Sequence, residues 1–558
     1  MKYYFIIYLL LQSGVSFGQN ALMIPPVIQS SNINLVLDEG VTSFYPGVIT
    51  NTMGANGAIL GPTLIMDQGA NLTITVENKL NDTTTIHWHG MHVAPENDGG
   101  PHSIIVPNTT WNPQFTVLDK AGLNWYHPHL HMKTDEHVSK GIAGLIIVRD
   151  AEEAGLNIPT TYGVDEFPLV LQTKGFDASG EILVHTDLDT SVMVNATVNA
   201  FVDVPAQVIR LRVLNASSQR VMELGFSDNR IFSLIGTDGG LLNAPVNLTR
   251  YRISSGQRAD ILVDLTSGLG ENFQLMSFAS ELPNGVYGAT QPGMGPGSTG
   301  SLPDYTSNAL NGSNYELLDI NVVAQTGIPV LSIPSTLASF TPISEASATT
   351  TRSLTFTSAT MGDLSGPFLI NNSSFDMNTI NYTVPFNNIE IWSLTNETPI
   401  AHPFHIHDIQ FFILDINGNP PPAELQGYND VVLVPGGMGN VRFIAQFNDF
   451  ANDSIPYMYH CHMLPHEDMG MMGQFLVVDP ASDTDELKKT GWRLYPNPSN
   501  GRITIVVNDP KELIITDVYG NIIKELKVTE LSVFDLNLTP GVYYVSDSER
   551  CFKKIVVQ

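Results

Sequence analysis

Cysteine is nearly absent from this chain of 558 residues, which contains only Cys461 and Cys551. A scaffold held by several disulfides is therefore excluded, and a chain of this length is expected to fold on its own core. Basic residues are also scarce, with 26 lysines and arginines against 55 acidic residues and a net charge of -29. This balance argues against a nucleic-acid-binding protein, which needs basic patches, and mildly favours cationic substrates or metal ions.

Long apolar runs are missing as well. The apolar stretch at residues 3–11 is far shorter than the ~20 residues that a transmembrane helix needs. It follows Lys2 and precedes small residues that end near Gly18, which is typical of a secretory signal peptide. We therefore predict a signal peptide over residues 1–18 and no transmembrane segment.

Turn-forming residues are abundant, with 46 glycines and 35 prolines between short apolar runs. Residues 72–76 alternate between apolar and polar side chains, which is the period of a half-buried strand. Many short strands joined by turns indicate β-sandwich domains, and the length predicts three or four of them. We therefore expect an all-β protein with sandwich domains over 19–155, 156–330 and 331–480.

One run of residues surrounds a cysteine with histidines. It reads His460-Cys461-His462 and is followed by His466 and Met471. Successive side chains on a strand point to opposite faces, so Cys461 is expected to face away from both flanking histidines. A thiolate, imidazoles and a distant thioether are the donors of a blue copper site. The tripeptide is therefore expected to touch two metal sites, one on each face.

Three further histidine clusters occur along the chain: His87-Trp88-His89, His127-Pro128-His129 and His402-Pro403-Phe404-His405-Ile406-His407. Two histidines that are two residues apart point to the same face of an extended segment. His402 is an odd number of residues from its partners, so it is expected on the other face, as Cys461 is. The first predicted donor group is His402, Cys461, His466 and Met471, the last two assigned by ligand type. The second comprises His87, His89, His127, His129, His405, His407, His460 and His462.

The donor types favour copper. The first group suits a single copper ion, and eight imidazoles are too many for one metal but suit three copper ions. Structural zinc takes four tetrahedral ligands, usually with several thiolates, and these motifs contain a single cysteine. A single His-x-His pair is more often an ordinary core or surface feature, whereas four such clusters together indicate metal binding.

These four motifs, in this order, resemble those of the multicopper oxidases, the family of laccases and copper-efflux oxidases, over roughly residues 20–480. The resemblance implies three consecutive cupredoxin-like Greek-key β-sandwich domains, the second a spacer without a copper motif. It implies four copper ions, with a trinuclear cluster between the first and third domains. The implied type 1 ligands are His402, Cys461, His466 and axial Met471. The implied type 2 ligands are His87 and His405, and the implied type 3 ligands are His89, His127, His129, His407, His460 and His462.

The resemblance also implies a reaction. Single electrons from an external reductant enter at the type 1 copper, and four of them reduce dioxygen to two waters at the trinuclear cluster. Asp98 and Glu467 match positions where copper-efflux-type members carry acidic residues near the cluster. A general acid must lie within hydrogen-bond reach of its target, directly or through one water. We therefore predict that Asp98 and Glu467 supply protons; a solvated loop acid is the alternative for each.

The reductant is less constrained by the sequence. Copper-efflux oxidases carry a Met- and His-rich insertion before the third-domain motifs, whereas residues 355–377 contain two methionines and no histidine. Thr398 and Ile400 stand where an Asp and a Met would be expected. Since thioethers recruit cuprous ion, we expect a laccase-like oxidase of phenols or aromatic amines, reduced at the solvent edge of His402 or His466. A cuprous, ferrous or manganous oxidase and a copper-sequestering protein without a committed substrate are the alternatives.

The C-terminal region has a different character. A polar linker is predicted over 481–492, followed by short alternating strands over 493–558. The run YPNPSNG at 495–501 and the strand at 541–545 resemble the C-terminal sorting domain of the type IX secretion pathway. The resemblance implies a small β-sandwich that serves as a removable address for that machinery. We therefore expect a secreted or cell-surface protein, exported through the periplasm of a Gram-negative bacterium; a carbohydrate-binding sandwich is the alternative.

Overall fold

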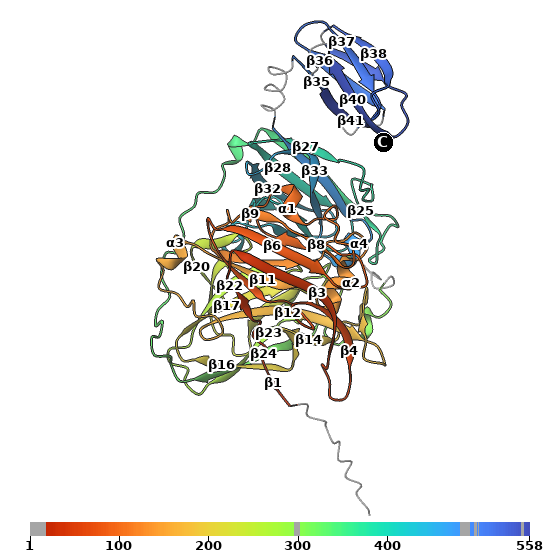
Figure 1. Ribbon diagram of the computed structural model, residues 1–558. Coiled ribbons are helices and arrows are strands. Elements are labelled where there is room, and N and C mark those ends of the chain that lie inside the picture. The colour runs from red at the N-terminus through yellow and green to blue at the C-terminus, as the bar shows by residue number, and fades with distance from the viewer. Residues whose placement is uncertain are drawn as a thin grey trace, which may run out of the picture.

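The computed structural model describes residues 18–294, 302–479, 491–495, 499, 501–529, 531–547 and 552–557. Residues 1–17 of the predicted signal peptide, most of the predicted linker and most of the YPNPSNG run lie outside these residues. Strand accounts for 48% of the chain and helix for 6%, which confirms the all-β prediction. Figure 1 shows strands of the first sandwich in red and orange, of the second in yellow and green, and of the third in teal to blue.

The first sandwich has two sheets. One contains, in spatial order, β2 (Val27–Ile28), β5 (Thr63–Asp67), β11 (Gly144–Arg149), β10 (Gly122–His127) and β7 (His87–His89). The other contains β4 (Thr50–Ala55), β3 (Asn32–Thr42), β6 (Asn71–Asn78) and β8 (Thr109–Trp111), with β9 (Gln114–Thr116) also paired to β6. The alternation predicted at residues 72–76 lies on β6, where Leu72, Ile74 and Val76 are buried.

The second sandwich also has two sheets. The larger contains β15 (Thr197–Val198), β14 (Ser191–Val194), β12 (Glu166–Phe176), β17 (Val208–Asn215), β22 (Arg258–Asp264), β19 (Phe232–Thr237) and β20 (Gly240–Leu248), with β13 (Ile182–Leu183) paired to β12. The smaller contains β1 (Asn20–Ala21), β16 (Ala200–Pro205), β24 (Tyr315–Val323), β23 (Asn272–Ser277), β18 (Met222–Phe226) and β21 (Tyr251–Ile253). Strand β1 thus precedes the first sandwich in the chain but pairs within the second.

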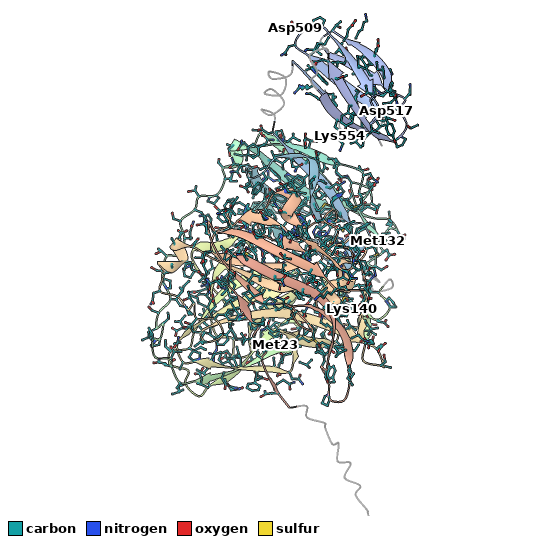
Figure 2. The ribbon with its side chains drawn as sticks, in the orientation of Figure 1. Met23, Met132, Lys140, Asp509, Asp517 and Lys554 are labelled. Carbon is teal, nitrogen blue, oxygen red and sulfur yellow. The ribbon has the colours of Figure 1, made fainter. Side chains whose placement is uncertain are left out.

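The third sandwich is built from two five-stranded sheets. One contains β26 (Phe368–Ile370), β25 (Thr350–Ser358), β28 (Asn388–Asn396), β32 (Gly439–Phe447) and β30 (Phe412–Ile416). The other contains β27 (Tyr382–Pro385), β34 (Met472–Val478), β33 (Asn452–Cys461), β29 (His402–Ile406) and β31 (Val431–Val434). An aromatic core around Trp392 joins the sheets and includes Cys461 and Met471. Figure 2 shows side chains filling the sandwiches.

The C-terminal region has a core of its own around Trp492 and Ile503. Its two sheets contain β35 (Trp492–Tyr495), β36 (Arg502–Val507) and β39 (Leu531–Asp535), and β38 (Ile522–Val528), β37 (Lys511–Thr516), β40 (Gly541–Asp547) and β41 (Phe552–Val557). Two small sheets around a separate core agree with the small β-domain predicted for this region.

Helices are short. They are α1 (Pro95–Asp98), α2 (Thr134–Lys140), α3 (Ala151–Ala154) and α4 (Leu464–Asp468), with 3-10 turns η1 (Ala279–Glu281), η2 (Tyr305–Ser307), η3 (Glu345–Ser347) and η4 (Ala423–Leu425). Helices α1 and α4 carry Asp98 and Glu467, and α2 contacts α4 across the boundary between the first and third sandwiches. Among the described residues, no helix has both the length and the hydropathy to cross a bilayer.

Candidate metal centres

Strand pairing determines which faces carry the histidines. In the first sandwich β7 pairs with β10, so that His87 lies opposite His127. In the third sandwich β29 pairs with β33, so that His405 lies opposite His460. Cys461 is one residue further along β33, and its side chain therefore points to the other face of this sheet. The sheet of the third sandwich thus presents imidazoles on one face and a thiol on the other.

The thiol face holds the first donor group. The Sγ atom of Cys461 lies 3.4 Å from Nδ1 of His402 and 3.7 Å from Nδ1 of His466, and these two nitrogens are 3.2 Å apart. All three side chains are buried. Met471 is buried in the same core, and its main-chain carbonyl accepts a hydrogen bond of 3.0 Å from the Cys461 amide. The structure therefore brings together the three predicted donors, with Met471 next to Cys461.

The chemistry of this group fits a copper ion. Burial lowers the pKa of His402 well below its usual value, with His466 adding to the effect, and lowers that of His466 to about 3. Both imidazoles are therefore neutral and carry a lone pair for a metal. Burial raises the pKa of the Cys461 thiol, so a thiolate there needs a cation beside it. A soft cation that accepts one thiolate and two imidazoles is copper.

On the opposite face, eight imidazoles converge from both sandwiches. One set contains His89, His127 and His462. The Nδ1 atom of His89 lies 3.2 Å from Nε2 of His462 and 3.4 Å from Nε2 of His127. Imidazole nitrogens bind transition metals at about 2.0–2.1 Å, which places ligands of one ion roughly 3.3 Å apart. The spacing of this set is therefore that of three ligands around one ion.

A second set repeats the arrangement with His129, His407 and His460. Their Nε2 atoms are separated by 3.1 Å between His129 and His460, 3.2 Å between His129 and His407, and 3.4 Å between His407 and His460. The remaining two imidazoles, His87 and His405, lie next to these sets. Among the described residues, their Nε2 atoms are buried without a hydrogen-bond partner. Two such orphaned nitrogens fit the donors of a further ion.

The outward nitrogens of these rings determine where the lone pairs point. Nδ1 of His87 and of His405 lie 3.0 Å and 2.9 Å from the main-chain carbonyls of Asp98 and Asp430, and Nδ1 of His127 lies 2.8 Å from that of Pro128. A carbonyl only accepts, so each of these Nδ1 atoms carries the proton and Nε2 carries the lone pair. Lone pairs that converge in a buried space repel one another unless a cation lies between them.

The two predicted acids both contact these histidines. Asp98 is buried, and its Oδ2 accepts a hydrogen bond of 2.8 Å from Nδ1 of His407. The Oε2 atom of Glu467 lies 3.2 Å from Nδ1 of His460, and Oε1 lies 3.4 Å from Nδ1 of His129. Neither is a solvated loop acid, since Glu467 is also buried.

Glu467 is held from the first sandwich. The hydroxyl of Thr134 on α2 donates a hydrogen bond of 2.7 Å to Oε1 of Glu467. Burial raises the pKa of Glu467 to about 7, against the opposing effect of His129. The carboxyl group is thus placed where it can hold a proton next to the histidines near neutral pH.

The structure distinguishes the two histidines, His402 and His466, at which a reductant is expected. The side chain of His402 has no exposed area, and its Nε2 lies 2.8 Å from the hydroxyl of Thr398, within hydrogen-bond distance. Burial beneath the loop before β29 and contact with the Phe368 ring close it off from solvent. His466 keeps 3% of its surface exposed, so it is the one of the two that reaches solvent.

Sequence reasoning missed Asp430 and Arg258. Asp430 Oδ1 lies 3.2 Å from Nε2 of His89, and the Arg258 guanidinium is bonded to both carboxylate oxygens of Asp430. No motif marks either residue, because their partners are distant in the chain.

The comparisons with known proteins agree with this geometry. Residues 38–153 and 342–481 each match a family described as multicopper oxidase. A multicopper oxidase of Staphylococcus haemolyticus is 31% identical over 487 residues, covering 83% of this chain and 94% of that protein. The chain belongs to the multicopper oxidase family.

Other similar proteins, at comparable sequence identity, have different names. The cell division protein FtsP of Sodalis glossinidius is 30% identical, over 84% of this chain and 94% of its own. A laccase-like multicopper oxidase, CueO, from the lignin-degrading bacterium Ochrobactrum sp. has 32% identity and a TM-score of 0.71, covering 82% of this chain and 100% of its own. As a multicopper oxidase, the protein is an oxidoreductase whose family implies copper.

The tail of this multicopper oxidase has a separate match. Residues 493–558 match the family described as secretion system C-terminal sorting domain. This match confirms the predicted sorting domain and indicates export.

Proposed function

We propose that this multicopper oxidase is a secreted, laccase-like enzyme that oxidises phenols or aromatic amines with dioxygen and uses four copper ions. One observation carries the proposal. Cys461 belongs to the thiol donor group, while both of its neighbours, His460 and His462, belong to the imidazole sets on the other face. An electron taken up on the Cys461 side therefore reaches either imidazole set through a few covalent bonds.

The donor groups have distinct roles in this proposal. His402, Cys461 and His466 would hold the type 1 copper, with Met471 as a further, weaker donor, and His87 and His405 would hold the type 2 copper. The type 3 pair is held by the sets His89, His127, His462 and His129, His407, His460. When bound, copper supplies one-electron oxidation of the substrate and four-electron reduction of dioxygen to two waters.

Protons come from two directions. Asp98 contacts His407, and Glu467 lies between His129 and His460, so each carboxyl group is one imidazole away from the proposed cluster. Both are buried, which keeps bulk water from competing for these positions. We assign them the role of holding protons for the water-forming reaction, since a general acid must lie within direct or one-water reach.

We propose an organic reductant that donates its electrons at His466. His466 is buried but keeps 3% of its surface exposed, so a reductant bound above it would lie one imidazole from the copper that His466 would hold. The Ochrobactrum relative, 32% identical to this chain, is described with oxidase activity towards lignin model compounds and lignosulfonate. That activity supports phenolic substrates here.

A second candidate function is oxidation of cuprous ion. Met294 and Met438 are 48% and 65% exposed. The main chains of both residues are hydrogen-bonded to the segment that precedes His402. The Met294 amide donates to the Pro399 carbonyl at 2.7 Å, and the Met438 amide donates to the Asn396 carbonyl at 2.8 Å. Exposed thioethers at this position suit a soft monovalent metal ion.

Oxygen uptake by the copper-loaded protein distinguishes the candidates, with a phenol, cuprous ion and ferrous ion supplied side by side. We expect the phenol to give the fastest uptake and Cys461→Ser to abolish it. Fastest uptake with cuprous ion, slowed in Met294→Leu and Met438→Leu, would favour the metal-ion oxidase instead. Bound copper without uptake on any reductant would favour sequestration.

The proposed export route is tested separately. We propose that residues 493–558 direct the protein through the periplasm to the type IX machinery, as the match to a sorting domain supports. Deleting these residues should leave oxidase activity intact and retain the enzyme in the periplasm. Release into the medium without the tail would contradict this route.

A further inference from the structure

One turn of the second sandwich reaches the imidazole sets, although none of the donors comes from that sandwich. Residues 254–257 join β21 to β22, and together with Arg258, the first residue of β22, they form turn 254–258, Ser-Ser-Gly-Gln-Arg. The side chain of Gln257 donates a hydrogen bond to the Val431 carbonyl, next to Asp430 in the third sandwich. The turn is thus inserted where the three sandwiches meet.

Arg258 ends the turn and is completely buried. Its guanidinium bonds both carboxylate oxygens of Asp430, and its amide donates a bond of 2.7 Å to Asp238. Asp430 in turn holds two donors: Oδ1 lies 3.2 Å from Nε2 of His89, and its carbonyl lies 2.9 Å from Nδ1 of His405. A buried carboxylate needs a counter-charge, so Arg258 determines where Asp430 can sit.

The middle of the turn contacts His462. A Cβ atom on Gly256 would lie 2.8 Å from the Cγ and Cδ2 atoms of the His462 ring, and Gly256 has a φ of +85°. Only glycine satisfies both conditions. The hydroxyl of Ser255 donates to the Ser217 carbonyl at 2.6 Å and lies 3.4 Å from Nδ1 of His462. The turn therefore lies against one side of this ring and next to its outward nitrogen.

We propose that turn 254–258 is a positioning clamp that orients His89, His405 and His462 for the trinuclear copper cluster. The inference rests on the proposed function, and it gives the second sandwich a role beyond spacing. Partners of the outward imidazole nitrogen fix the tautomer and ring orientation of a ligand, and their loss typically weakens metal affinity or activity 10–100-fold. Arg258 is a positioning residue, because it acts through Asp430.

The type 1 donors provide an internal reference. Within the described ranges, the hydrogen bonds of turn 254–258 do not involve His402, Cys461 or His466. A variant of the turn that still folds should therefore retain the blue absorbance of type 1 copper. Loss confined to the type 2 and type 3 copper then separates positioning from general destabilisation.

The test uses the copper-loaded full chain with Arg258→Lys, which keeps the charge but loses the two-pronged fork. Asp430→Asn is a second variant of nearly unchanged size. Arg220→Lys is the matched control, because Arg220 is equally buried in the second sandwich and makes a two-pronged pair with Asp189 away from the donors. Measurements are copper per chain during dialysis against a chelator, blue absorbance, and the type 2 electron paramagnetic resonance signal.

For Arg258→Lys and Asp430→Asn we expect roughly 10–100-fold weaker retention of the three cluster coppers. The type 2 signal should change, while the blue absorbance stays as in the unmodified protein. The Arg220→Lys control should keep all four coppers. Unchanged retention and an unchanged type 2 signal in both variants would overturn the clamp, as would equal loss of blue absorbance and cluster copper.

Failure of the clamp and failure of the proposed function give different results. If the unmodified protein holds four coppers but oxidises no phenol, the substrate proposal fails and the clamp is still measured by copper retention. If the unmodified protein binds only type 1 copper, the four-copper proposal fails, and the clamp falls with it.

Discussion

Nδ1 of His407 lies 2.8 Å from Oδ2 of Asp98, across the boundary between the third and first sandwiches. The carbonyl of the same Asp98 lies 3.0 Å from Nδ1 of His87. One residue thus touches a proposed type 3 ligand and a proposed type 2 ligand. A carboxyl group in this position can hold a proton beside the site of water formation without itself binding metal.

Asp98→Asn should therefore slow dioxygen turnover by about 100-fold, within the range for loss of a general acid. The amide keeps the size of the side chain, so the blue absorbance should be unchanged. Stopped-flow reoxidation of the reduced enzyme measures the effect. Glu96→Gln is the control, because Glu96 is an exposed acid on the same helix. Turnover in Asp98→Asn equal to that of the control would refute the proton role.

Glu467→Gln tests the acid on the other side. The amide cannot donate the carboxyl proton, so oxygen uptake should fall by about 100-fold. Thr134→Val, which removes the hydroxyl that donates to Oε1, should have a smaller effect in the same direction. Glu136→Gln on the facing helix is the control, because Glu136 is paired with Lys133 and Lys140. Steady-state uptake that is unaffected in Glu467→Gln would exclude this residue as a donor.

Met471→Leu tests the axial position. A thioether donates electron density to an oxidised copper ion and a Leu side chain does not, so the variant should have a higher type 1 potential. Spectroelectrochemical titration of the blue absorbance measures it. Met472→Leu is the control, since Met472 is also buried but lies opposite His460 in the β33–β34 pairing, outside the core that contains Cys461 and Met471. An identical potential in Met471→Leu would remove Met471 from the ligand set.

His92 makes stability depend on pH. Burial disfavours its charged form, but Asp119 at 2.7 Å and Asp449 at 3.5 Å outweigh burial and raise the pKa from 6.5 to about 10. A raised pKa in the folded state gives stability that is complete below pH 6.5 and is lost as pH rises towards 10. His92→Gln should therefore cost about 2 kcal/mol at acidic to neutral pH.

Thermal melting across this pH range measures the difference between His92→Gln and the unmodified protein. The difference should shrink as the pH approaches 10, where His92 is no longer fully charged. His102→Gln is the control, because the His102 ring is hydrogen-bonded to the amide oxygen of Gln474 rather than to a carboxylate. A constant difference at every pH would contradict the charged pair.

Much of the fold followed from local pattern. The two-residue period at 72–76 predicted strand β6, whose apolar residues are buried. The pairing of β1 with β16 could not be predicted, because a two-residue strand carries no period and its partner lies 180 residues away. The sequence also left open which of His402 and His466 is less buried, since the burial of His402 depends on the Thr398 hydroxyl and on loops that only the folded chain brings together.

The sequence by itself determined the donor types and the faces on which they lie, because metal preference depends on the donor atom and strand parity depends on neighbouring residues. It predicted, without any tertiary information, that the Cys461 side chain lies on one face of its strand and those of His460 and His462 on the other. Only the tertiary structure decided which imidazoles share a set and that Arg258 and Asp430 support them. Those relations join side chains of different sandwiches, such as His89 and His462 or Arg258 and Asp430, and they arise from the packing of three sandwiches rather than from any local pattern.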